Sequence, residues 1–270
     1  MRIVCASICY RGFAEDEVAA TLARAPGIGY RFMEIHGPMV WSPEAVDAFD
    51  LDGVRQRIRG SGMTCVGIYP PGWGGRDAED VRVRALAIAK VAGFAESLGA
   101  DHLTSTGASP RGEPGAFDRV IDCVRRVLDL VPAACPLSFA LEPHLGNVLE
   151  QEEDFARLLE AVPDPRVSVC VDTGHFHSAG VDTPAFIRNF GPRIRSVHLK
   201  DHLGTVSVGI GRGEIDLAAQ IGALREAGYT GDLTIELEVQ DPKNLPRYTE
   251  EAFIYVSGLI GAKLGGAARR

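Results

Sequence analysis

The most constraining feature of this sequence is a regular alternation of short apolar runs with longer amphipathic segments. The apolar runs are rich in Val, Ile, Leu, Cys and Thr, as buried parallel strands tend to be. The eight runs lie at residues 3–9, 31–35, 64–69, 102–106, 137–142, 167–172, 194–200 and 233–239. Eight strand–helix units within 270 residues predict a closed (β/α)8 barrel, with an open doubly wound sheet as the alternative.

The segments between the apolar runs have helical periodicity and recognisable end signals. Residues 78–98 form a broad apolar stripe and are followed by Gly99, a common helix stop. Shorter segments of the same kind lie at residues 117–131, 154–162 and 217–227. We therefore expect one barrel domain over residues 1–264, followed by a disordered tail over residues 265–270.

The charge, the hydropathy and the cysteines of the sequence indicate which partners and which compartment to expect. The formal net charge is −8, and the sequence has no long cluster of Lys and Arg residues. A nucleic-acid partner is therefore not expected. No apolar run reaches the length of about 18 residues that a membrane-spanning helix needs, so no membrane partner is expected either. The six cysteines form no Cys-x-x-Cys pair, and the chain starts without a signal-peptide pattern. A reducing cytoplasm is the expected compartment.

Chemically active side chains stand at the ends of the last four predicted strands. The active sites of such barrels lie at the carboxyl ends of the strands. The residues at these ends are Glu142, Asp172, His198 and Glu236. A buried carboxylate is costly unless a partner neutralises it, and one shared divalent cation would serve all four residues. The alternative is that they are four separate polar residues in loops. Carboxylate and imidazole ligands suit Mn²⁺, Zn²⁺, Co²⁺ or Mg²⁺.

The alternation of side chains along a strand indicates which nearby polar residues point toward the same site. Glu236 and Glu238 share one face because successive side chains of a strand point to opposite sides. Glu236 lies deeper along the strand and is assigned to the metal, while Glu238 stays an alternative ligand. His198 and Lys200 share a face in the same way.

Five short motifs in the second half of the chain, taken in order, carry a family resemblance. They are Leu141-Glu142-Pro143, Val171-Asp172-Thr173-Gly174-His175, Val197-His198-Leu199-Lys200-Asp201, Gly211-Arg212-Gly213-Glu214-Ile215-Asp216 and Gly228-Tyr229-Thr230-Gly231. With them the chain resembles the sugar isomerase/epimerase group of xylose-isomerase-like TIM barrels, which includes ketose 3-epimerases and inosose dehydratases. The endonuclease IV branch of that group fits less well, because no Asp-x-His follows the seventh strand.

The resemblance implies an enzyme with one divalent metal ion, for which Mn²⁺ is the first choice. Glu142 and Glu236 would bind the metal and also form the acid/base pair. The expected reaction is an isomerisation or epimerisation in which a proton is removed beside a carbonyl and the metal stabilises the enediolate. The alternatives are a lyase or dehydratase acting on an inosose or keto-sugar, including the C-glycoside-cleaving type, and a sugar-binding protein without turnover. The expected partner is a small sugar or polyol, and the group suggests a homodimer or homotetramer.

A second set of residues is predicted to contact the substrate. By the resemblance, His175 would contact substrate oxygens. The further candidates are His144, Lys200, Arg212, Glu238, Trp41 and Trp73, with Glu34, His36 and Tyr69 also at predicted rim positions. Arg212 lies in a Gly-x-Gly-x-Gly run that resembles a dinucleotide fingerprint, but the spacing is wrong and the run does not follow a first strand.

Overall fold

The computed structural model describes residues 1–37 and 42–261, and its centre is a closed barrel of parallel strands. The strand order around the barrel is β1-β10-β7-β6-β5-β4-β3-β2. The strands are β1 (Arg2–Ala6), β2 (Phe32–Ile35), β3 (Thr64–Ile68), β4 (His102–Thr106), β5 (Ser138–Glu142), β6 (Val167–Asp172), β7 (Ile194–Leu199) and β10 (Asp232–Ile235). The predicted (β/α)8 barrel is confirmed, and the open sheet is excluded because β1 pairs with both β2 and β10.

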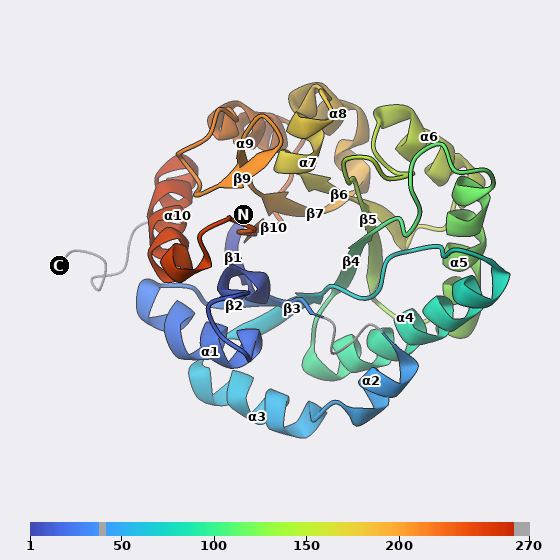
Figure 1. The fold of residues 1–270 in the computed structure, drawn as a ribbon, viewed down its shortest axis with the longest axis horizontal. Coiled ribbons are helices and arrows are strands. Elements are labelled where there is room, and N and C mark those ends of the chain that lie inside the picture. The colour runs from blue at the N-terminus through green and yellow to red at the C-terminus, as the bar shows by residue number, and fades with distance from the viewer. Residues whose placement is uncertain (38–41, 262–270) are drawn as a thin grey trace.

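Helices surround the barrel as an outer ring (Figure 1). They are α1 (Glu17–Ile28), α2 (Pro43–Ala48), α3 (Leu51–Ser61), α4 (Ala78–Leu98), α5 (Ala116–Leu130), α6 (Glu152–Ala161), α7 (Thr173–Ser178), α8 (Thr183–Phe190), α9 (Leu217–Glu226) and α10 (Leu245–Ile260). The described residues also form the short 3-10 helices η1 (Ser7–Tyr10), η3 (Gly191–Arg193) and η4 (Pro242–Asn244). The apolar faces of the helices and the outward-facing strand residues form one continuous core.

Local signals explain why the predicted helix limits agree well with the structure. In α4, the Asp77 side chain accepts hydrogen bonds from the backbone N–H groups of Glu79 and Asp80, which caps the first turn. Gly99 closes the same helix with a φ of 77°, a conformation that costs glycine little. Caps of this kind act over a few residues and are therefore visible in the sequence.

Two predicted strands were too long. The first apolar run was expected to stay in the sheet through residue 9, but β1 ends at Ala6 and the chain enters η1. The last run was expected to reach residue 239, but β10 ends at Ile235. The first extension stays buried after it leaves the sheet, and in the last one Glu236 and Leu237 stay buried. An apolar run predicts that residues are buried, but it does not predict the residue at which a strand leaves the sheet.

A small hairpin was also missed. Strands β8 (Asp201–Leu203) and β9 (Val206–Val208) pair antiparallel directly after β7. The glycine-rich run beyond the hairpin is held by the buried Asp201, whose Oδ2 accepts from the backbone N–H groups of Gly211 and Gly213 at 2.9 Å. This run is a tightly anchored turn at the rim of the barrel.

All six cysteines are buried and unpaired, as expected of small apolar residues. Within the described parts of the chain, no helix combines the length and the apolar character needed to cross a membrane. The predicted tail over residues 265–270 lies outside the described residues.

Candidate metal centre and active site

Four side chains from four neighbouring strands converge at the carboxyl end of the barrel. Glu142 ends β5, Asp172 ends β6, His198 lies near the end of β7, and Glu236 directly follows β10. One ligand atom from each lies within 4.8 Å of the others, and all four residues are buried. The structure therefore brings together the whole set that the strand ends predict.

The strand register explains this convergence. Asp172 pairs with His198 across β6 and β7, and Thr234 pairs with His198 across β7 and β10. Glu236 lies two residues beyond Thr234, on the same face of its strand. Asp172, His198 and Glu236 therefore lie close together at the carboxyl ends of three neighbouring strands.

The polar atoms of the cluster fit a divalent cation. His198 Nδ1 lies 2.5 Å from Glu142 Oε1 and 2.8 Å from Glu236 Oε2. Asp172 Oδ2 and Glu236 Oε2 are buried, and neither accepts a well-oriented hydrogen bond from the described residues. Buried carboxylate oxygens without hydrogen bonds are costly, and a coordinated cation removes that cost. Three carboxylates and one imidazole form a ligand set that Mn²⁺, Co²⁺ or Zn²⁺ accepts.

Glu238 occupies a different place from Glu236. Its side chain is 44% exposed, and its Oε2 accepts from Lys200 Nζ at 2.6 Å. Glu236 is 4% exposed and belongs to the four-residue cluster. Of the two candidates for the strand-end ligand, Glu236 has the buried position.

Lys200 balances part of the negative charge. Its Nζ lies 3.3 Å from Asp172 Oδ2 and 3.5 Å from Glu236 Oε1, although the side chain is buried. Burial lowers the pKa of the Lys200 ammonium, but Asp172, Glu236 and Glu238 outweigh that effect and raise the pKa well above its usual value. Burial likewise raises the pKa of Glu236, and the nearby Lys200 and His198 reverse this and hold it well below the usual range.

A cavity of about 570 Å³ opens above the cluster. Its wall includes Glu142, Lys200, Glu236 and Glu238, together with His144 and His175. The rings of His144 and His175 lie 4.0 Å apart, and His175 Nε2 lies 3.2 Å from Lys200 Nζ. Burial and the Lys200 charge lower the pKa of His175 to about 3, so this ring is neutral near pH 7.

Tyr69 and His36 also line this cavity. The Tyr69 hydroxyl donates to Glu142 Oε2 at 2.7 Å, and its ring stacks on His36 at 4.7 Å. Burial, and after it the charges of Glu142 and Glu236, raise the pKa of Tyr69 well above its usual value, so the hydroxyl keeps its proton. The sequence suggested both residues for the rim but gave no partner for either.

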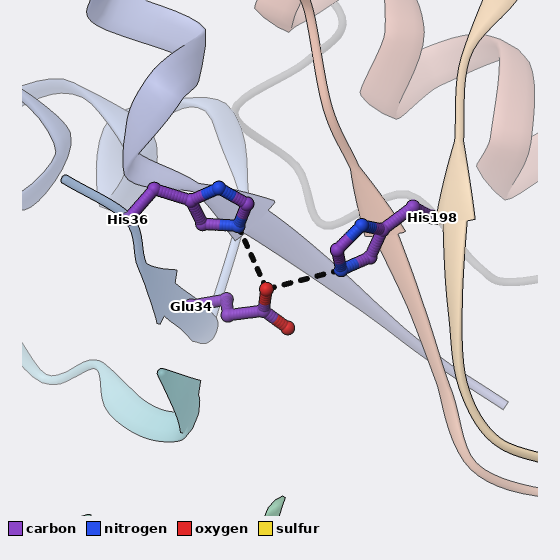
Figure 2. A group of neighbouring side chains, drawn as sticks. All are labelled: Glu34, His36 and His198. Carbon is purple, nitrogen blue, oxygen red and sulfur yellow. Dashed lines mark hydrogen bonds and ion pairs between the residues drawn. The ribbon is translucent and has the colours of Figure 1, made fainter. Parts of the chain in front are cut away.

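Glu34 lies beneath the cluster and not at the rim. Figure 2 shows its carboxylate between His36 and His198, with Oε1 at 2.7 Å from His36 Nε2 and 3.0 Å from His198 Nε2. A metal-binding histidine commonly donates its second ring nitrogen to a carboxylate, which fixes the ring and its tautomer. Glu34 thus directs Nδ1 of His198 toward the other three candidate ligands. The only sequence signal was a carboxylate inside an apolar strand.

Three predicted substrate contacts lie elsewhere or are not described. Arg212 is directed toward α10, where it pairs with Glu251 at 2.7 Å, and it is absent from the wall of this cavity. Trp73 is fully buried beside Phe139 and does not line the cavity. Trp41 lies outside the described residues. Loop side chains follow tertiary contacts that a single sequence does not specify.

Comparison with known proteins agrees with this architecture. The chain is 32% identical over 145 residues to an inosose dehydratase of Geobacillus thermodenitrificans, a match that covers 47% of this chain and 48% of that protein. The chain thus spans about half the length of the curated relatives that it matches.

Two solved structures share the fold over nearly the whole chain. The IolI protein with a bound zinc atom superposes with a TM-score of 0.81 at 17% identity, covering 98% of this chain and 100% of that one. D-allulose 3-epimerase from Methylomonas sp. superposes with a TM-score of 0.77 at 15% identity, covering 96% of each chain. The family model described as xylose isomerase-like TIM barrel matches residues 22–255. The chain therefore belongs to the xylose isomerase-like TIM barrel family.

Proposed function

We propose that this protein is a divalent-metal-dependent enzyme that removes a proton from the carbon beside the carbonyl of a keto-sugar or inosose. The buried cluster of Glu142, Asp172, His198 and Glu236 at the base of the cavity is the observation that carries this proposal. A cavity of about 570 Å³ with several polar groups suits a small polyhydroxylated molecule.

The four cluster residues would hold one ion, with Mn²⁺ as the first choice and Zn²⁺, Co²⁺ or Mg²⁺ as alternatives. When bound, the ion supplies Lewis-acid stabilisation of negative charge on substrate oxygens. The Glu34 carboxylate keeps the His198 ring oriented for this role. Lys200 offsets the remaining charge of the three carboxylates.

Glu142 and Glu236 are the proposed acid/base pair. They come from β5 and β10, which β6 and β7 separate in the barrel, so they approach the substrate from different sides. One glutamate removes the proton on the carbon, and the other holds or returns a proton on the far side. A general base of this kind contributes about 10²–10⁴-fold to the rate.

The residues of the cavity wall would orient the substrate hydroxyls. The Lys200 ammonium and the neutral His175 ring lie next to each other above the cluster, and each offers a polar hydrogen or lone pair. Glu238 accepts from Lys200 and, being partly exposed, is positioned to accept from a hydroxyl at the mouth. The His144 ring packs against the His175 ring, with the ring centres 4.0 Å apart.

For the fate of the carbanion we favour elimination of water. The base takes the proton from the carbon beside the carbonyl, the hydroxyl on the next carbon leaves with a second proton as water, and a double bond forms between the two carbons. The similarity of about half the chain to inosose dehydratases supports this outcome. Cleavage of a C-glycoside by the same chemistry is a variant of it, with a carbon leaving group.

Epimerisation or isomerisation is the second candidate. It is favoured by the placement of two glutamates on different strands, which would allow removal of a proton from one face and its return to the other. The same first step serves both reactions, so only the products distinguish them.

The test is incubation of the protein with Mn²⁺ and a panel of inososes and ketoses in D₂O, followed by NMR and mass spectrometry. An unsaturated product with loss of water supports the dehydratase, and deuterium at the carbon beside the carbonyl supports the epimerase or isomerase. Metal-dependent binding of these sugars without exchange would refute the enzyme proposal and indicate a sugar-binding protein.

A further inference from the structure

The contacts that hold Glu34 beneath the candidate metal centre continue toward the amino-terminal end of the barrel. Glu34 uses Oε1 for His36 and His198, and its second oxygen, Oε2, lies 3.2 Å from His102 Nε2. His102 is the first residue of β4 and is completely buried. It therefore contacts Glu34 from the amino-terminal end of the barrel, and the hydrogen-bond partners of its ring are Asp101 and Glu34.

A glycine makes this contact possible. Gly67 of β3 pairs with Glu34 on one side and with His102 on the other, so the three residues stand in register across three strands. A Cβ atom at position 67 would lie only 2.3 Å from His102 Nε2. The missing side chain thus leaves the space through which the imidazole crosses β3 to reach Glu34.

The other ring nitrogen of His102 is anchored at the far end. Nδ1 lies 2.8 Å from Asp101 Oδ1, and the half-exposed Asp101 in turn pairs with Arg195 at 2.6 Å. An ionised carboxylate only accepts hydrogen bonds, so a ring that lies between two carboxylates donates from both nitrogens. Burial lowers the pKa of His102, but Asp101 and Glu34 outweigh it and raise the pKa above the usual value.

We propose that His102, held by Asp101, is a positioning residue for the metal centre: it fixes Glu34, which in turn fixes His198 with Nδ1 toward the cluster. This inference rests on the proposed metal centre. The ring of His102 keeps Oε2 of Glu34 engaged, which leaves Oε1 for His198. Without that ring, a buried carboxylate oxygen loses its partner and the Glu34 side chain turns or takes up a proton. The Nε2–H group of His198 then loses its acceptor.

Direct partners of a metal-binding histidine typically change metal affinity by about 10–100-fold when they are lost. We expect Glu34→Gln to fall in that range. His102→Leu should weaken binding in the same direction by a smaller factor, because it acts through Glu34. His102→Gln should restore part of the affinity, since its amide nitrogen can still donate to Glu34.

The experiment measures dissociation constants for Mn²⁺ and Co²⁺ by competition with a chelator, and records the visible absorption of bound Co²⁺. This absorption reports ligand geometry directly, and a merely structural contribution to stability would not change it. His177→Leu is the matched control, because His177 pairs with Glu214 near the surface, 3.0 Å away, and takes no part in the chain from Asp101 to His198. The expected result is weaker binding and an altered Co²⁺ spectrum in His102→Leu, with His177→Leu unchanged.

Gly67→Ala provides an independent variant that removes no polar group. The new methyl group displaces the His102 ring from Glu34, so it should reproduce the weaker binding and altered spectrum. If His102→Leu shows no cooperative melting transition, the metal affinity and the Co²⁺ spectrum are compared in His102→Gln and Gly67→Ala instead.

Two results would overturn the inference, and they are distinguishable. Unchanged affinity and spectrum in the folded His102 and Gly67 variants would refute the positioning role while leaving the metal centre intact. Failure of the unsubstituted protein to bind either ion would refute the metal centre itself, and this inference with it.

Discussion

The hydroxyl of Tyr69 donates to Glu142 Oε2 at 2.7 Å, while Glu142 Oε1 faces His198. Tyr69 thus holds the outer oxygen of a glutamate whose inner oxygen lies in the cluster. The contact joins the end of β3 to the end of β5 across the mouth of the barrel.

Tyr69→Phe should therefore lower kcat while leaving the fold intact. A hydrogen bond to a charged group is worth about 1.5–3 kcal/mol, which corresponds to roughly a 10- to 100-fold loss of rate if the bond is made in the transition state. The phenyl ring can still stack on His36, so KM should change little. Steady-state kinetics with the substrate identified in D₂O would measure this, and an unchanged kcat would show that Glu142 does not depend on Tyr69.

Glu142→Gln and Glu236→Gln should each abolish proton exchange at the substrate carbon. The amide keeps the shape of the side chain but cannot accept the proton, and a general base contributes about 10²–10⁴-fold. Exchange is followed by NMR in D₂O, with circular dichroism to establish that the fold is retained. Glu79→Gln, which alters an exposed carboxylate paired with Arg82 on α4, is the control. Exchange at the wild-type rate in either cluster variant would contradict the assignment.

Metal removal should lower the melting temperature reversibly. A ligand that binds only the native state stabilises it by about 2.7 kcal/mol at 100 times its dissociation constant. Thermal unfolding with excess chelator and then with excess Mn²⁺ measures this increment. His198→Ala should lose it, because the cluster then lacks its only imidazole. An equal response of His198→Ala and the unsubstituted protein would indicate that the ion binds elsewhere.

Stability should fall as the solution is acidified from about pH 6.5 toward pH 3. The pKa of His175 is about 3 in the folded protein and near its ordinary value of 6.5 in the unfolded chain. Between these values the unfolded state binds the extra proton, so protonation favours unfolding as the pH falls. Urea unfolding at several pH values would show a smaller decline for His175→Phe than for the unsubstituted protein. Identical slopes would mean that His175 titrates normally.

The fold and the four candidate ligands were predictable because they depend on local or topological regularities. Apolar runs at strand spacing specify the barrel, and parallel strands bring their carboxyl ends to the same rim. Glu142, Asp172, His198 and Glu236 each stand at such an end, so the topology alone places them near one another. Helix end signals such as Gly99 are local and were equally visible.

The choice between Glu236 and Glu238 required the structure. Both residues point to the same side of their strand, and the sequence does not reveal where β10 leaves the sheet. The chain departs after Ile235, which keeps Glu236 in the buried cluster and brings Glu238 to the Lys200 ammonium near the solvent. The directions of Arg212 and Trp73 were likewise set by contacts with Glu251 and Phe139, which are distant in sequence.

By itself, the sequence determined a closed barrel whose last four strands end in candidate metal ligands. Only the tertiary structure decided what stands beneath them. The strand register of the barrel brings the third residue of β2, Glu34, level with the first residue of β4, His102, across the gap at Gly67. That register depends on the closure of all the strands together, which no single stretch of sequence encodes. It places a carboxylate and a second histidine under His198, in positions that strand ends alone do not predict.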